Sequence, residues 1–143
     1  MILGYNYRMT EVTAAIGIEQ LKKLDKDLRI RRELAETLTS ELACVEGISP
    51  PYVHPDASHA YYTYPVVVRR RDEFQEKILK RGVYFGQGGY KPLHLFSYYG
   101  GMLGQLPVAE WAEKNIAFTD IIKQPLTSKD IKYIIECIKQ SVV

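Results

Sequence analysis

Two side chains near the amino terminus have the chemistry of an anion-binding turn. Asn6 carries a neutral amide donor, and Arg8 carries a planar guanidinium whose donors match the oxygens of a phosphate or carboxylate. Gly4 precedes them and permits backbone conformations that other residues resist. Thr10 follows as a candidate N-cap of a helix. The sequence therefore predicts a polar, anion-competent turn fixed to the start of a helix.

The remaining candidates for chemistry are sparse. His54, His59 and His94 are the only histidines, and the first two lie five residues apart beside prolines rather than on one helical face. Nothing nearby supplies the other ligands of a tetrahedral metal site, so no metal site is predicted. There is no phosphate-binding glycine motif, no nucleophile elbow and no Cys-x-x-Cys. Taken alone, the residues identify no catalytic group.

Composition narrows the class of protein. The chain has 143 residues, 46% of them hydrophobic, and a net charge of +2, which is too small to indicate nucleic acid or an anionic membrane as the main partner. No apolar run approaches the roughly 20 residues that cross a bilayer. Cys44 and Cys137 fit two free thiols in a reducing cytoplasm, with a disulfide between them left open. We expect one soluble cytoplasmic domain.

A long amphipathic helix should follow the opening turn, from about residue 10 to about residue 43. Apart from Arg31, which interrupts the pattern, its apolar residues alternate at spacings of three and four, which indicates one buried stripe: Leu21, Leu24, Leu28, Ala35, Leu38 and Leu42. Gly17 weakens the helix by about 1 kcal/mol relative to Ala. Close approach of another backbone would explain a glycine there. The helix should end before Gly47.

The rest of the chain predicts a small α/β domain. The order strand, helix, strand after residue 60 is typical of the start of a βαβ-like unit. The long glycine- and tyrosine-rich loop at 86–106 contains Tyr90 and His94, and loops of this length in compact domains are usually functional. The expected elements are strands at 61–68, 83–85 and 121–122, a helix capped by Asp72 and ended by Gly82, a helix from Leu106 to about Ala117, and a last helix capped by Ser128.

Several stretches, in order, resemble one family of enzymes. They are Gly4-Tyr5-Asn6-Tyr7-Arg8-Met9-Thr10, His59-Ala60-Tyr61-Tyr62, Arg71-Asp72-Glu73-Phe74, Tyr90-Lys91-Pro92-Leu93-His94 and Leu106-Pro107-Val108-Ala109-Glu110. This series resembles the C-terminal portion of the DegT/DnrJ/StrS-type sugar aminotransferases, which are pyridoxal-phosphate (PLP) enzymes of the aspartate-aminotransferase fold. The resemblance runs over nearly all 143 residues. It implies that residues 1–143 form the small C-terminal domain, with the helix at about 10–43 as the interdomain helix, and that the N-terminal cofactor domain is absent.

The resemblance also implies roles for particular residues. Asn6 and Arg8 would lie close to the cofactor of a partner subunit, with Asn6 helping to bind its phosphate, so a homodimer is implied. His59, Tyr90 and His94 would surround the mouth where the sugar substrate enters. Family members commonly have a His where this chain has Gly89, which puts a substrate contact at that position in doubt.

The lysine that holds PLP covalently in this family would lie upstream of Met1. Lys22, Lys23 and Lys91 are poor substitutes, because an ordinary surface ammonium stays protonated. The expected function is therefore part of a transaminase that moves an amino group, usually from glutamate, to a nucleotide-linked keto-sugar, and the chain alone should be inactive. Two alternatives stay open: a non-catalytic module in which the leucine stripe pairs two copies, and a truncated homologue that binds phosphorylated ligands.

Overall fold

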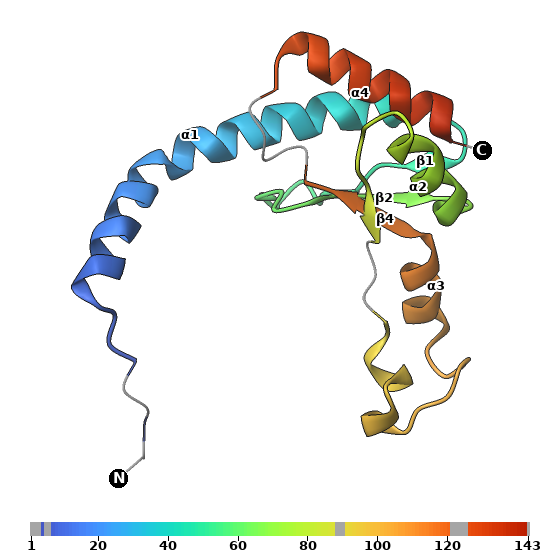
Figure 1. Ribbon diagram of the computed structural model, residues 1–143, viewed down its shortest axis with the longest axis horizontal. Coiled ribbons are helices and arrows are strands. Elements are labelled where there is room, and N and C mark those ends of the chain that lie inside the picture. The colour runs from blue at the N-terminus through green and yellow to red at the C-terminus, as the bar shows by residue number, and fades with distance from the viewer. Residues whose placement is uncertain (1–3, 5–6, 88–90, 121–125, 143) are drawn as a thin grey trace.

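The computed structural model describes residues 4, 7–87, 91–120 and 126–142. Its helices are α1 (Glu11–Leu42), α2 (Arg71–Leu79), α3 (Pro107–Asn115) and α4 (Ser128–Ser141), with the short 3₁₀ helices η1 (Leu93–Leu95) and η2 (Ser97–Tyr99). The strands are β1 (Ile48–Ser49), β2 (Tyr64–Val68), β3 (Gly86–Gln87) and β4 (Ile116–Thr119). The predicted α/β class is confirmed: a long first helix precedes a small sheet covered by helices (Figure 1).

Helix α1 matches the predicted long helix within one residue at each end. Thr10 is its N-cap, and the Thr10 hydroxyl accepts a hydrogen bond from the Thr13 amide at 3.3 Å. The prediction of one buried stripe is wrong for the first two-thirds of the helix. Leu21 and Leu24 are 67% and 44% exposed, and the buried residues of α1 are Leu34, Ala35, Leu38 and Leu42. Only the last third of α1 therefore packs on the body of the domain (Figure 1).

The sheet has the order β1-β2-β4-β3, and each neighbouring pair is antiparallel. Because β2 and β3 both run antiparallel to β4, they run parallel to each other with β4 between them. The predicted βαβ-like order of β2, α2 and β3 is thus present, but β4 lies between the two strands in the sheet. The strand expected at 83–85 begins three residues later, at Gly86, and the strand expected at 121–122 lies outside the described residues.

One face of this sheet forms the core. Tyr64, Val66 and Val68 on β2 are buried, and the register places Tyr64 beside Thr119 and Val66 beside Ala117. Helices α1, α2 and α4 cover this face with apolar side chains: Leu38, Leu42, Phe74, Ile78, Ile134, Ile135 and Ile138. The period-two burial of β2 is what a strand with one covered face requires.

Three helix ends differ from the sequence prediction. The first helical residue of α2 is Arg71, after Arg70 in the left-handed region at φ 58°, so Asp72 lies inside the helix rather than capping it. Helix α3 ends at Asn115, because residues 116–119 pair with β2 and β3 instead. Thr127, not Ser128, caps α4 in a capping box with Asp130. Gly82 ends α2 at φ +77°, as predicted.

Two further findings bear on the predictions. Cys44 and Cys137 are both free thiols, the first exposed and the second buried. None of the described helices is both long and apolar enough to cross a membrane.

Candidate functional site

Arg8 lies just before α1, at the end of the helix that points away from the sheet (Figure 1). Its side chain is exposed. Asn6, the other residue predicted to bind an anion, lies outside the described residues. The first buried residue of α1 is Leu34, so about 23 helical residues, or roughly 35 Å of helix, lie between the start of α1 beside Arg8 and the core of the domain. The guanidinium is therefore held at the end of a rod, away from the fold that carries it.

His59 lies in the loop that leads into β2. Its Nδ1 accepts a hydrogen bond from the Tyr61 amide at 2.8 Å, and its carbonyl accepts one from Arg32 Nε at 3.0 Å. The His59 ring also lies against the Tyr61 ring, with centroids 4.4 Å apart. Since Nδ1 is the acceptor, the ring proton of neutral His59 resides on Nε2. The loop is thereby attached to α1 while the residue itself stays exposed.

Tyr61 and Tyr64 lie behind this loop in the core. Tyr64 is fully buried, and its hydroxyl lies 2.9 Å from the hydroxyl of Thr39 on α1. Burial raises the pKa of Tyr64 to about 12 and also raises the pKa of Tyr61. Both phenols are consequently neutral at ordinary pH, and the contact of the Tyr64 hydroxyl with Thr39 joins β2 to α1.

His94 makes a largely buried hydrogen bond to Glu110 that joins η1 to α3. Its Nε2 lies 2.9 Å from Glu110 Oε1, and the two side chains are only 12% and 10% exposed. The Glu110 carboxylate also accepts hydrogen bonds from the Gly104 amide at 2.8 and 2.9 Å and from the Leu106 amide at 3.4 Å. The hydrogen bond from His94, followed by those from the two amides, lowers the pKa of Glu110. An ionised Glu110 thus fixes the orientation of the predicted substrate residue His94.

Gly101 makes this arrangement possible. A Cβ atom at this position would lie 2.3 Å from the carbonyl oxygen of His94, well inside van der Waals contact. The residue that lies against the His94 carbonyl after η2 must therefore be glycine. Glu110 was not predicted as a site residue, although its place four residues after Leu106, behind a glycine-rich loop, was a usable signal.

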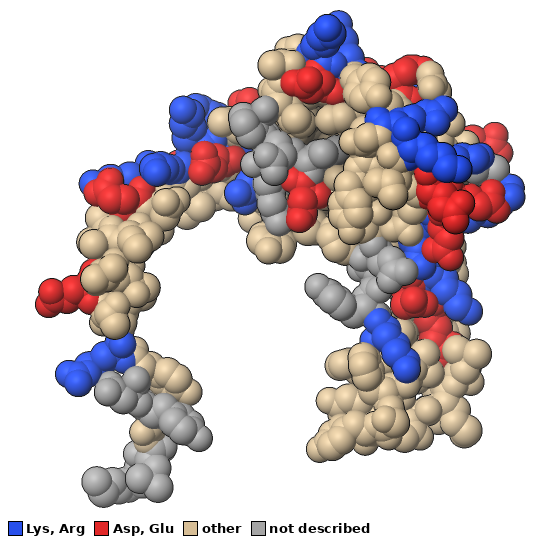
Figure 2. Space-filling view, viewed as in Figure 1, with Lys and Arg blue, Asp and Glu red and all other residues tan. Residues whose placement is uncertain are grey.

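The segment 92–109, named here the arm, contains no Asp, Glu, Lys or Arg. It stands away from the sheet, and the face of its tip seen in Figure 2 carries no charged side chain. The arm exposes large apolar side chains: Leu93, Phe96, Tyr98, Tyr99, Met102, Leu103, Leu106 and Val108. The loop predicted to be irregular at 86–106 is thus partly ordered, by β3, η1 and η2.

Among the described residues, the structure places Arg8 and His94 apart within this chain. The arm with His94 and the amino-terminal end of α1 with Arg8 extend from the body with an open space between them (Figures 1 and 2). Tyr90 lies outside the described residues. The first part of α1 also exposes large apolar side chains, as the arm does: Val12, Ile16, Ile18, Leu21 and Leu24. Exposed apolar surfaces on this scale are typical of interaction sites.

A family model, the DegT/DnrJ/EryC1/StrS aminotransferase family, matches residues 1–139. The chain belongs to this family. Among its relatives, the UDP-4-amino-4,6-dideoxy-N-acetyl-beta-L-altrosamine transaminase of Campylobacter jejuni is 31% identical over 138 residues, which is 92% of this chain and 36% of the relative. This aminotransferase-family chain therefore spans little more than a third of that enzyme.

Solved structures of the same family share the fold. The aminotransferase TlmJ from Streptoalloteichus hindustanus superimposes with a TM-score of 0.81 at 34% identity, over 91% of this chain and 35% of TlmJ. The sugar aminotransferase CalS13 from Micromonospora echinospora gives a TM-score of 0.85 at 26% identity, over 96% of this chain and 37% of CalS13. The predicted resemblance to the C-terminal portion of sugar aminotransferases is confirmed.

Proposed function

We propose that this chain is the C-terminal portion of a PLP-dependent sugar aminotransferase. The intact enzyme would move an amino group from an amino acid, with glutamate as the expected donor, to the keto group of a nucleotide-linked sugar. Membership of the aminotransferase family supports the reaction class. The name of the Campylobacter relative, a transaminase of a UDP-linked amino sugar, supports the substrate class.

The observation that carries this proposal is the position of Arg8. A guanidinium about 35 Å along a helix from the first buried residue lies far from the core of its own small domain. It can reach a second subunit. We therefore infer a homodimer in which Asn6 and Arg8 of one subunit bind the cofactor phosphate held by the other.

The donor chemistry suits that task. A guanidinium presents several N–H groups to a phosphate dianion, and an amide adds a neutral donor. When bound, PLP would supply the electron sink and carry the amino group between substrates. This chain's own residues would bind the phosphate and shape the substrate mouth through His59, Tyr90 and His94. Glu110 keeps His94 in one orientation, so the imidazole can donate or accept a hydrogen bond at a fixed place.

The covalent lysine is proposed to belong to the rest of the full-length enzyme. Lys22 lies on an exposed helix face, where its ammonium pairs with Glu19. Lys91 lies over the Phe96 ring, with Nζ 5.2 Å from the centroid. Neither is in the desolvated setting that makes a lysine nucleophilic. The isolated chain, mixed with PLP, glutamate and a keto-sugar nucleotide, should give no turnover, and measurable turnover would contradict the proposal.

Subunit complementation tests the shared site directly. One full-length subunit would carry Arg8→Ala, and the other would lack the covalent lysine. Each homodimer should be nearly inactive, because each lacks one half of every site. Mixed dimers should regain about half the wild-type activity per dimer, since one of their two sites pairs an intact lysine with an intact Arg8. Mixed dimers as inactive as the parents would show that Arg8 does not act across the interface.

A further inference from the structure

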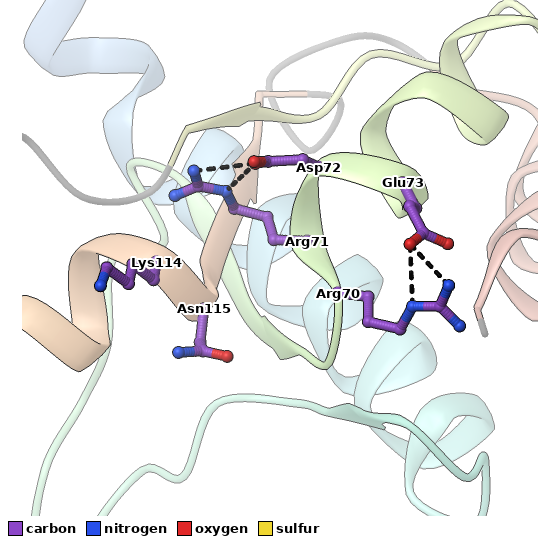
Figure 3. Close-up of a pocket in the computed structure, with 6 residues that line it drawn as sticks. All are labelled: Arg70, Arg71, Asp72, Glu73, Lys114 and Asn115. Carbon is purple, nitrogen blue, oxygen red and sulfur yellow. Dashed lines mark hydrogen bonds and ion pairs between the residues drawn. The ribbon is translucent and has the colours of Figure 1, made fainter.

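Two shallow clefts adjoin on the surface between the turn after β2, the start of α2 and the end of α3. The first has a volume of about 450 Å³ and is lined by Arg70, Arg71, Asp72, Glu73, Lys114 and Asn115 (Figure 3). The second, of about 350 Å³, is lined by Gly47, Ile48, Ser49, Val67, Arg69, Trp111 and Asn115. Asn115 lies in the wall of both clefts. The two hollows therefore form one continuous surface with different chemistry at each end.

Positive charge dominates this surface. Arg70 is paired with Glu73 at 2.6 Å, and Arg71 is paired with Asp72 at 2.9 Å (Figure 3). Within the described part of the chain, the exposed side chains of Arg69 and Lys114 have no acidic partner. Two unpaired cations thus remain, one in each cleft. A guanidinium and an ammonium so placed favour a ligand with negative charge.

Arg71 makes the surface rigid. Its side chain is only 6% exposed, although it carries a charge, and its NH1 donates a hydrogen bond to the carbonyl oxygen of Glu113 near the end of α3. This contact joins the first turn of α2 to the last turn of α3. The walls of the first cleft are therefore fixed before any ligand arrives, which lowers the entropy cost of binding.

Trp111 gives the second cleft a flat apolar wall. Its side chain is 50% exposed, and Ile48 and Val67 line the cleft with it. The Asn115 side-chain amide donates a hydrogen bond to the Trp111 carbonyl at 2.8 Å, which fixes that amide at the junction of the clefts. An indole face beside a guanidinium is a suitable surface for a planar ring that carries an anionic group.

We propose that these clefts form a binding site for an organic phosphate with a planar ring, of the nucleoside phosphate class. The ring would stack on Trp111, Arg69 would bind the first phosphate, and Lys114 would bind a second phosphate across Asn115. The site is separate from the Arg8 turn and from the arm, and it would hold a ligand in addition to the substrate of the proposed transaminase. The proposal does not depend on that activity.

The chain offers a direct readout, because Trp111 is its only tryptophan. Indole fluorescence of the whole chain, excited at the red edge where tyrosine and nucleobases absorb little, would be titrated with a nucleoside, its monophosphate, its diphosphate and inorganic phosphate. We expect saturable quenching by both nucleotides, with the diphosphate binding more tightly, and little change with phosphate or nucleoside alone. No saturable change with either nucleotide up to about 5 mM would overturn the proposal, since affinity weaker than this is negligible for a specific site.

Matched variants distinguish binding at this site from a general effect of the net charge of the chain. Arg69→Gln should weaken both nucleotides about ten-fold or more, because a charge-assisted hydrogen bond is lost. Lys114→Gln should remove the advantage of the diphosphate over the monophosphate. Arg29→Gln changes the same charge on the exposed face of α1 and should leave both affinities unchanged. Equal weakening by Arg29→Gln and Arg69→Gln would overturn the proposal, and circular dichroism would verify that each variant is folded.

Discussion

A pair of identical substitutions on α1 tests whether most of this helix lies outside the small domain's core. Leu38 is 1% exposed and Leu21 is 67% exposed, although both belong to the same predicted stripe. Replacing a fully buried Leu by Ala costs about 3 kcal/mol, from lost apolar burial and from the cavity left behind. The same change at Leu21 should cost about 0.5 kcal/mol or less in the isolated chain, since little area is lost and Ala is a good helix former.

The assay is urea and thermal unfolding of the isolated chain followed by circular dichroism. For a domain of this size, about 3 kcal/mol corresponds to a fall in the melting temperature of roughly 10 °C for Leu38→Ala, against about 1 °C for Leu21→Ala. In the proposed full-length dimer, Leu21→Ala should instead weaken association, because we expect that face to be covered there. Equal destabilisation by both substitutions in the isolated chain would refute the assignment of α1 as a rod that extends from the core.

Three further outcomes follow from the site geometry. Glu110 has a lowered pKa in the folded chain, so the unfolded chain binds more protons below the ordinary value of 4.5. The attachment of His94 should therefore be intact above pH 4.5 and be lost as the pH falls toward the lowered pKa. Hydrogen exchange of the arm should show this loss, and Glu110→Gln should abolish the pH dependence. Gly101→Ala should increase exchange in the arm without changing exchange in the sheet, because its Cβ would overlap the His94 carbonyl; unchanged exchange in the arm would contradict the close approach. Thr127→Ala should cost about 1 kcal/mol in urea unfolding while Ser128→Ala costs much less, because Thr127 is the cap of α4; the reverse order would restore the original prediction.

Local sequence signals were sufficient to predict the helix ends that depend on a single capping residue. Thr10 was recognisable as a cap because its side chain satisfies an amide of the first turn, and the structure confirms this contact. Gly82 was recognisable as a helix end because glycine adopts the positive φ that often ends a helix at the lowest cost. The order of motifs also predicted the family, which the match over residues 1–139 confirms.

Predictions that needed tertiary information were wrong. Residues 116–119 follow helix-like sequence, yet they form the central strand β4 because β2 and β3 offer backbone partners on both sides. The apolar spacing of α1 predicted a buried stripe throughout, but spacing reports only which residues share a face. Whether protein covers that face depends on the rest of the fold, and at Leu21 this chain supplies no cover.

The features of the candidate site also fall into those that the sequence predicted and those that only the tertiary structure showed. By itself the sequence determined the long helix and its cap, because capping and periodicity act between residues close in the chain, and it predicted a polar turn with Asn6 and Arg8 before that helix. Only the tertiary structure decided that Glu110 fixes His94, that Arg71 joins α2 to α3, and that Trp111 lies beside Arg69. These residues are 16 to more than 40 positions apart in the sequence. They come together only when the sheet and helices pack.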